Sequence, residues 1–268
     1  KQIFINQSFL LVYMDKKIAA KVFAFVIISI SIGFILYFGF SGDVKNSPDS
    51  DCTTIKKSES GVLNIAFLSY KYNNNEDFMK MVNSYVYGNN GFNNVEPFRS
   101  NFDKLSFYAV FSSSAMCNVE DGTLICDDYS VKRIASKCPN DFIFVLADRN
   151  SFVDALSPIR SSAYLNLASI NTADHELVVL HEFAHLFGRL VDEYVDDASY
   201  KGLALRNAPN CDNKECKKWE DFKDTECLKG CALSNYYRSK DFTIMRNYFK
   251  SNSFGVYNEW LLNKSLQR

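Results

Sequence analysis

The amino-acid sequence predicts an α/β domain, built on a mixed sheet with helices on its faces and preceded by a single transmembrane helix. Strand-like apolar runs alternate with helix-like segments after residue 60, which is the pattern of a sheet covered by helices. A long uncharged run precedes these segments, and all eight cysteines follow it. With 47% hydrophobic and 23% charged residues and a net charge of −1, the chain is neither disordered nor collagen-like, and no excess of positive charge indicates a nucleic-acid partner.

The expected membrane segment is residues 22–40, VFAFVIISISIGFILYFGF, nineteen positions without a charge. A helix rises about 1.5 Å per residue, so this run just spans the ~30 Å hydrocarbon core of a bilayer. Lysines precede it and the residues after it lean acidic, which favours a cytoplasmic N-terminus and a domain outside the cell membrane. The alternative is the signal peptide of a secreted protein, although such an apolar region usually has about 7–15 residues and ends at a small-residue cleavage site.

The segments on either side of this run are assigned from composition. Residues 1–21 form the expected cytoplasmic tail. Within the tail, Met14 begins an ordinary basic leader, so residues 1–13 have a second interpretation as upstream sequence that is not translated. Residues 41–60 are polar and lack apolar periodicity, which predicts a linker. The globular domain is then expected over residues 61–268.

Apolar spacing predicts the elements of that domain. Residues 62–70, VLNIAFLSY, form a continuous apolar run that is typical of a buried strand, and residues 75–86 have helical spacing. The other expected strands are 105–112, 142–146 and 163–170, with a further helix near 130–137.

The cysteines predict disulfide bonds, because an even number of them is confined to the expected exterior, where an oxidising compartment preserves such bonds. Cys117 and Cys126 flank Asp121-Gly122, a strong hairpin-turn signal, so their strands are expected to bring the two sulfurs face to face. Bonds are also expected within the last four cysteines, with a structural zinc site as the alternative. Those four are Cys211, Cys216, Cys227 and Cys231, and Cys52 and Cys138 remain as a pair.

The chemistry is concentrated in residues 181–185, HEFAH. Histidines four positions apart lie one above the other on a helix face, so His181 and His185 can reach one tetrahedral zinc ion. Glu182 is close enough to take a proton from a zinc-bound water, which is the arrangement of zinc metallopeptidases. The third histidine, His175, is off this face and is expected to be a surface or capping residue.

The surrounding residues support a helix here. Thr172 or Asp174 is the expected N-cap, and Gly188 is the expected stop.

A catalytic zinc needs a third protein ligand. Gly188 is placed for the sharp turn that delivers this ligand in metzincins, but the usual position of the third histidine is Val191, which cannot bind metal. Asp192 follows directly and is the favoured ligand, with Glu193 as the alternative. A gluzincin-like enzyme would instead use a distant glutamate, for which the candidates are Glu215, Glu220 and Glu226.

These motifs resemble the active-site signature of the metallopeptidase family named after a bacterial IgA-cleaving enzyme. HEFAHLFGRLVDEY at 181–194 is similar to that family's HExxH, glycine turn and Asp-Glu-Tyr, and YYRSKDFTIMRN at 236–247 is similar to its Tyr-Arg and Met-turn. A weaker resemblance covers about 200 residues, and the cysteine-rich insert at 211–231 does not match. The resemblance implies a metzincin-like catalytic domain with the active-site helix beneath a twisted sheet, and it implies that Met245 lies beneath the metal.

The expected function is therefore a Zn²⁺-dependent endopeptidase that hydrolyses extracytoplasmic peptides or proteins and contacts the membrane through its N-terminal helix. Tyr237, Arg238 and Tyr248 are the candidate donors to the oxyanion, and Tyr194 is expected to anchor the turn that carries Asp192. Two alternatives remain, which are a zinc exopeptidase or other zinc hydrolase with a distant glutamate ligand, and a non-catalytic surface domain that binds a partner.

Overall fold

The structure is a computed structural model that describes residues 51–200, 205 and 208–267. The expected tail, membrane segment and first ten residues of the expected linker lie outside these described residues. Within the described part of the chain, no helix is both long enough and apolar enough to cross a bilayer.

The described domain is built on a six-stranded mixed sheet with the order β1-β3-β2-β6-β8-β7, as the sequence predicts for the class of fold. The four central strands are parallel, and the two edge strands, β1 and β7, run antiparallel to their neighbours. The strands are β1 (Thr53–Lys56), β2 (Leu63–Tyr70), β3 (Leu105–Val110), β6 (Phe142–Ala147), β7 (Ser162–Tyr164) and β8 (Leu167–Asn171).

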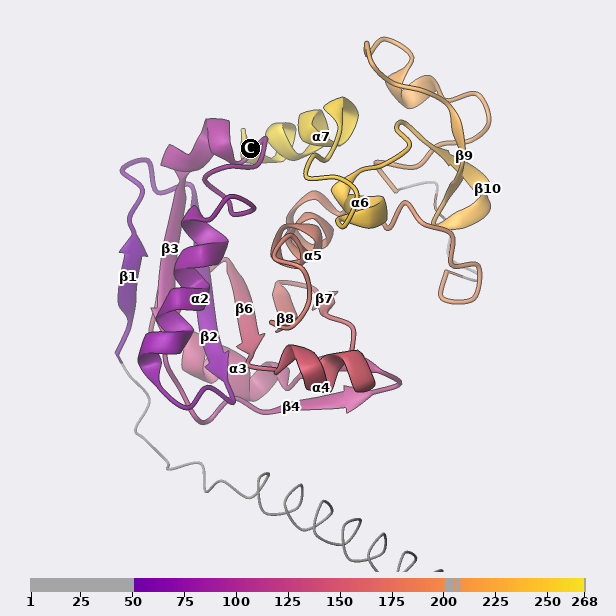
Figure 1. Cartoon of the computed structure of the whole chain (residues 1–268). Helices are drawn as coiled ribbons and strands as arrows, with labels where there is room; N and C mark the ends of the chain where they lie inside the picture. Colours follow the sequence, from indigo (N-terminus) through magenta and orange to yellow (C-terminus); the bar gives the residue numbers. More distant parts are fainter. Residues whose placement is uncertain (1–50, 201–204, 206–207, 268) are drawn as a thin grey trace, which may run out of the picture. The chain divides into compact units, whose positions relative to one another are not determined.

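Helices cover both faces of this sheet, which explains why its central strands are continuous apolar runs (Figure 1). On one face, alternate residues of β2 such as Ile65 and Phe67 pack with α2, α5 and α7. On the other face, Ala66 and Leu68 pack with α3. The helices are α2 (Asn75–Tyr87), α3 (Asp128–Ala135), α4 (Ser151–Leu156), α5 (Val178–Gly188), α6 (Ile244–Asn247) and α7 (Val256–Leu266), with 3-10 turns η1 (Arg99–Lys104) and η3 (Lys217–Trp219).

Two expected boundaries are wrong. The expected linker extends to residue 60, but β1 already forms at 53–56 and pairs with β3. Backbone hydrogen bonds to β3 hold this edge strand, and its side chains are partly exposed. Its sequence therefore needs no apolar pattern that would have predicted a strand. The expected strand at 163–170 is two antiparallel strands, β7 and β8, because the chain reverses at Leu165, whose φ is 55°.

The disulfide predictions are confirmed. Cys117 and Cys126 are bonded and lie directly opposite each other in the hairpin of β4 (Cys117–Glu120) and β5 (Thr123–Cys126), and Cys52 is bonded to Cys138. The last four cysteines form the bonds Cys211–Cys231 and Cys216–Cys227 around the hairpin of β9 (Leu228–Cys231) and β10 (Leu233–Arg238). These sulfurs are therefore not free thiolates, and the alternative of a structural zinc site among them is wrong.

The side chain of Phe183 fixes α5 to the sheet. It is 0% exposed, and its ring lies 5.1–5.4 Å from those of Phe92, Phe98, Phe142 and Phe187. Because α5 carries HEFAH, this aromatic cluster sets the position of the histidines relative to the sheet.

We expect Phe183→Ala to lower the free energy of unfolding by about 3–5 kcal/mol, because it leaves a cavity at the centre of this cluster. Phe152→Ala is the matched control, because Phe152 is 72% exposed on α4 and its truncation is expected to cost less than about 0.5 kcal/mol. Denaturant unfolding of the metal-free protein measures both. Equal losses in the two variants would contradict the central role of Phe183.

Candidate metal centre

The helix α5 brings His181, Glu182 and His185 to one end of a cleft. The rings of His181 and His185 lie 4.7 Å apart, centre to centre, as the i, i+4 spacing predicts. The helix begins without a side-chain N-cap, so neither Thr172 nor Asp174 has the expected role. His175 lies before the helix, and its Nδ1 accepts a hydrogen bond from the backbone N–H of Leu177, the N-cap residue, at 3.2 Å.

The chain reverses sharply after α5. Gly188 is the last helical residue, as expected, but the left-handed conformation is that of Arg189, whose φ is 54°. Gly188 instead allows α7 to pack closely, because a Cβ atom there would lie 2.5 Å from Cδ2 of Leu262 and would displace that side chain. The reversal returns Asp192 to the two histidines.

Three potential ligand atoms meet at this point. His181 Nε2 and His185 Nε2 are 3.1 Å apart, and Asp192 Oδ1 lies 3.1 Å from the first and 3.3 Å from the second. A tetrahedral zinc with ligand bonds of ~2.0–2.1 Å separates neighbouring ligand atoms by about 3.3 Å. The three residues therefore fit the protein ligands of a zinc site that keeps its fourth position open.

Backbone carbonyls fix which nitrogen of each imidazole faces the others. His181 Nδ1 lies 3.0 Å from the carbonyl oxygen of Ile244, and His185 Nδ1 lies 2.7 Å from that of Leu190. A carbonyl can only accept, so each Nδ1 carries a hydrogen, and when both rings are neutral the lone pair of each Nε2 faces the other ligand atoms. In that state the buried Asp192 Oδ1 has no hydrogen-bond donor. Three lone-pair atoms this close repel one another unless a cation or a proton lies among them.

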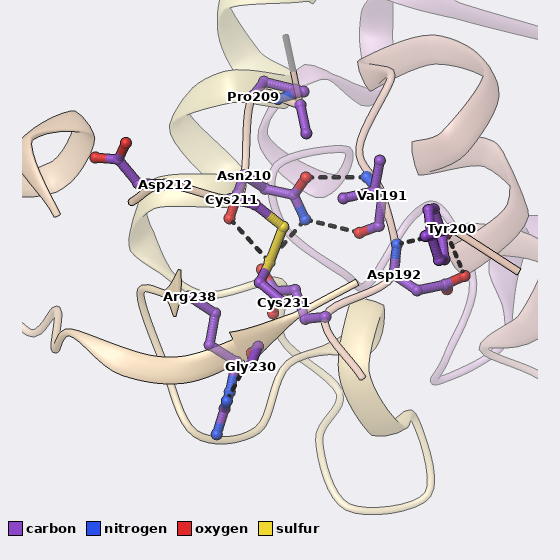
Figure 2. Close-up of a disulfide and its surroundings, with 12 residues drawn as sticks. Val191, Asp192, Tyr200, Pro209, Asn210, Cys211, Asp212, Gly230, Cys231 and Arg238 are labelled. Carbon is purple, nitrogen blue, oxygen red and sulfur yellow. Dashed lines mark hydrogen bonds between the residues drawn. A yellow bond between two sulfur atoms is a disulfide. The ribbon is translucent and has the colours of Figure 1, made fainter. Parts of the chain in front are cut away.

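A tyrosine that sequence reasoning missed orients Asp192. The hydroxyl of Tyr200 donates to Asp192 Oδ2 at 2.8 Å, which leaves Oδ1 to face the histidines (Figure 2). Nothing in the local sequence indicates this contact, because Tyr200 follows the HEFAH motif at no characteristic spacing and reaches Asp192 only through the turn at 196–199.

Glu193 points away from the three ligand atoms and has a structural role. It is 0% exposed, and its carboxylate accepts hydrogen bonds from Thr243, from Asn258 at 2.8 Å and from Asn210 at 3.3 Å. Its backbone N–H donates to the carbonyl oxygen of Met245 at 2.9 Å. Asn210 also forms two hydrogen bonds with the backbone of Val191 (Figure 2). This network ties the ligand loop to the segments before α6 and before β9 and to α7.

The other candidate residues divide into near and distant groups. Met245 is buried in α6, directly after the residue that binds His181. The ring of Tyr248 lies 5.4 Å from that of His181, and its hydroxyl donates to Asp174. Tyr194 lines the cleft, and its hydroxyl interacts with Asp192.

None of the three expected oxyanion donors lines the cleft, and Tyr248 alone lies beside a histidine ligand. Arg238 is buried, donates to the carbonyls of Lys229 and Gly230 and pairs with Asp241, so it stabilises the β9–β10 hairpin (Figure 2). Tyr237 packs in the cluster around Trp219. Both lie close to the Met-turn in sequence only. The distant glutamates, Glu215, Glu220 and Glu226, are exposed and do not belong to the group of ligand atoms.

The cleft has a volume of about 350 Å³ and extends from the metal-ligand group to the edge strand β7. Apart from the three ligands, its lining includes Arg160, Ser162, Glu182, Tyr194 and Tyr200. An edge strand, a buried carboxylate and a potential metal centre therefore share one open depression.

Burial and mutual charge set the protonation of these groups. Burial raises the pKa of the Glu182 carboxyl, which suits a group that must accept a proton. Burial disfavours charge at His185, but the hydrogen bond and negative charge of Asp192 outweigh it and raise the pKa of His185 to about 9. Burial acts to raise the pKa of Asp192, but the two imidazoles hold it well below its usual range.

Removal of each of the two neighbouring carboxylates is expected to affect a different property, zinc affinity for Asp192 and stability for Glu193. Asp192→Ala is expected to lower zinc affinity by at least about 100-fold, since a direct ligand is lost. Glu193→Ala is expected to lower the free energy of unfolding by about 2–5 kcal/mol, because it leaves the buried Thr243 hydroxyl without its acceptor and takes one of two acceptors from the amides of Asn210 and Asn258. Zinc titration against a competing chelator and denaturant unfolding of the metal-free proteins measure the two effects. Undiminished zinc affinity in the Asp192 variant would contradict the ligand assignment.

The raised pKa of His185 also gives a pH dependence. Below about pH 9 the metal-free site holds a proton on His185 that zinc must displace. Apparent zinc affinity is therefore expected to rise about tenfold per pH unit from pH 7 to 9 and then to level off. Chelator competition at several pH values, corrected for protonation of the chelator, measures this slope. An affinity that does not change between pH 7 and 9 would contradict it.

No family model matches the chain, and no match is found among curated proteins. The likeness of HEFAHLFGRLVDEY to one metallopeptidase family therefore remains a resemblance of sequence motifs.

Proposed function

We propose that the protein is a zinc-dependent endopeptidase. One observation carries the proposal, which is the convergence of His181 Nε2, His185 Nε2 and Asp192 Oδ1 at 3.1–3.3 Å from one another beside a buried glutamate. When bound, zinc would polarise the scissile carbonyl and lower the pKa of a water molecule. The donor set, two imidazoles and one carboxylate, is one that zinc hydrolases use.

Glu182 is the proposed general base. It follows His181 directly on α5 and lines the same cleft, so its carboxylate is beside the ligand group without belonging to it. Glu182 would accept a proton from the attacking water and donate it to the departing amine. Burial raises the pKa of Glu182 above that of an exposed glutamate and so moves it toward neutral pH. A pKa nearer the working pH favours both accepting the proton from water and donating it to the amine.

Tyr248 is the proposed donor to the oxyanion. It is the member of the expected set that lies beside His181, and its hydroxyl keeps a hydrogen that it now gives to Asp174. Burial and the charge of Asp174 raise the pKa of Tyr248, so the hydroxyl remains protonated at neutral pH. A small rotation toward the cleft would redirect this donor to a substrate.

The edge strand β7 favours a peptide as the substrate. It is the outermost strand on its side of the sheet, and Ser162 and Ala163 line the cleft. An extended peptide can pair with such an edge through backbone hydrogen bonds, which recognise a chain rather than a particular side chain. This mode suits cleavage within a chain.

The proposed setting is the exterior of the cell. The described domain has four disulfides, and disulfides persist mainly in oxidising compartments such as the cell exterior. Residues 22–40 would supply either the anchor or the secretion signal.

The test compares the zinc-loaded wild type with Glu182→Gln on a mixture of short synthetic peptides, with products identified by mass spectrometry. The variant is expected to bind one equivalent of zinc and to cleave at least about 100-fold more slowly, because the amide cannot accept the proton. Equal rates would remove Glu182 as the base. Internal cleavage sites would support an endopeptidase, and release of terminal residues alone would support an exopeptidase.

A further inference from the structure

The guanidinium of Arg160 is a charged group in the cleft that the proposed chemistry does not use. Among the described residues that line the cleft, it carries the only cationic group apart from the histidines. No carboxylate of the described chain lies within ion-pair distance of it. Arg99, Arg149, Arg238 and Arg246, in contrast, each pair with an aspartate or a glutamate.

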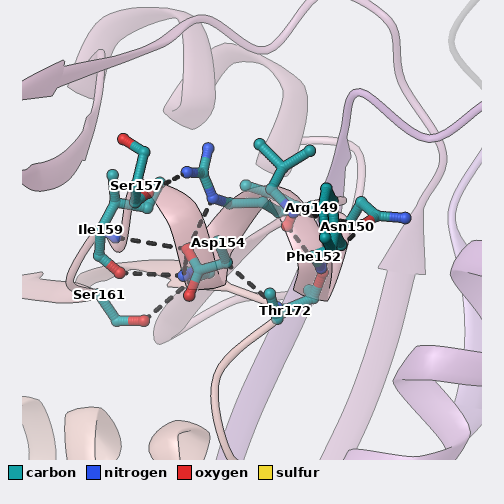
Figure 3. Close-up of polar contacts among 12 residues, drawn as sticks. Arg149, Asn150, Phe152, Asp154, Ser157, Ile159, Ser161 and Thr172 are labelled. Carbon is teal, nitrogen blue, oxygen red and sulfur yellow. Dashed lines mark hydrogen bonds and ion pairs between the residues drawn. The ribbon is translucent and has the colours of Figure 1, made fainter.

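The backbone on both sides of Arg160 is held in place. Its N–H donates to the carbonyl of Gly122 and its carbonyl accepts from Leu124, both at 2.8 Å. Ile159 donates to Asp154, which also pairs with Arg149, and Ser161 accepts from Asn171 (Figure 3). The exposed side chain therefore starts from a fixed point, and one guanidinium nitrogen lies 3.3 Å from Thr123 Oγ1.

The acidic groups of the cleft are already occupied. Asp192 faces the two histidines and Tyr200. Asp196 accepts from the backbone N–H and the hydroxyl of Ser199. The hydrogen bonds from Ser199 lower the pKa of Asp196, and the charge of Arg160 adds a smaller share without forming an ion pair. Apart from its contact with Thr123 Oγ1, the fork of donors on Arg160 is available to a carboxylate from outside, the group it binds best.

The position of Arg160 along the cleft indicates which part of a peptide it meets. It lies two residues before β7, which starts at Ser162. A peptide that pairs antiparallel with β7 has its C-terminal part at the beginning of that strand. In this pairing the residues on the C-terminal side of the cleaved bond would lie toward Arg160.

We propose that Arg160 is a specificity residue that recognises a substrate carboxylate on the C-terminal side of the cleaved bond. This inference rests on the proposed peptidase function. The carboxylate has two sources, an acidic side chain or the free C-terminus of the peptide. The first gives an endopeptidase that prefers acidic residues, and the second gives an enzyme that removes short C-terminal pieces.

The experiment uses zinc-loaded full-length protein and matched pairs of peptides built on a sequence that the wild type cleaves. One pair has Glu or Gln on the C-terminal side of the cleaved bond, and the other has a free or an amidated C-terminus. Loss of a charged hydrogen bond changes kcat/KM by about 10- to 100-fold, so the wild type is expected to prefer one carboxylate peptide by that ratio. In Arg160→Gln the ratio is expected to fall close to one, and Arg160→Lys is expected to retain part of it. The pair that shows the preference identifies the source.

Arg133→Gln is the control, because Arg133 is an exposed arginine of α3 that does not line the cleft. This variant is expected to keep the wild-type ratio. Equal kcat/KM for both members of each pair in the wild type, or an unchanged ratio in Arg160→Gln, would overturn the role of Arg160 and leave the peptidase function intact. If the wild type cleaves no peptide, the peptidase function fails and this inference fails with it.

Discussion

Glu193 carries a buried acid group that joins four segments of the chain, and the geometry of the ligand loop depends on it. A carboxylate away from water is costly unless hydrogen bonds compensate it, and burial raises the pKa of Glu193 accordingly. Thr243, Asn210 and Asn258 supply those hydrogen bonds from three different segments. Since Asp192 is the preceding residue, fixing Glu193 and its backbone N–H fixes the point from which Asp192 reaches the histidines.

The two adjacent acidic residues thus have different roles. Glu193 faces the protein, where neutral donors satisfy it and hold Thr243, the residue before Ile244, whose carbonyl binds His181. Asp192 faces the cleft, where Tyr200 takes one oxygen and leaves the other directed at two nitrogen lone pairs. The first arrangement stabilises the fold. The second brings together groups that repel one another unless a proton or a metal cation lies among them, which is the physical basis for proposing a metal centre.

Local sequence patterns predicted the features that depend on a single helix, hairpin or strand. The i, i+4 spacing placed His181 and His185 together, the turn at Asp121-Gly122 placed Cys117 against Cys126, and the apolar runs predicted β2 and β6 as strands but not their order in the sheet. Features that depend on distant partners were missed or misassigned. β1 is defined by backbone hydrogen bonds to β3, Tyr200 by its reach to Asp192, and Arg160 by the hairpin that holds it. Tyr237 and Arg238 were expected near the metal because they precede Met245 in sequence, but the β9–β10 hairpin carries them away.

The central claim is that the two histidines and Asp192 hold one zinc ion. The most direct measurement is a crystal structure of the zinc-loaded protein with anomalous diffraction recorded on both sides of the zinc absorption edge. We expect a single strong peak at ~2.0–2.1 Å from His181 Nε2, His185 Nε2 and Asp192 Oδ1, with an open fourth position toward the cleft. A peak bound through Glu193 or a distant glutamate, or no peak at the histidines in zinc-saturated crystals, would contradict it.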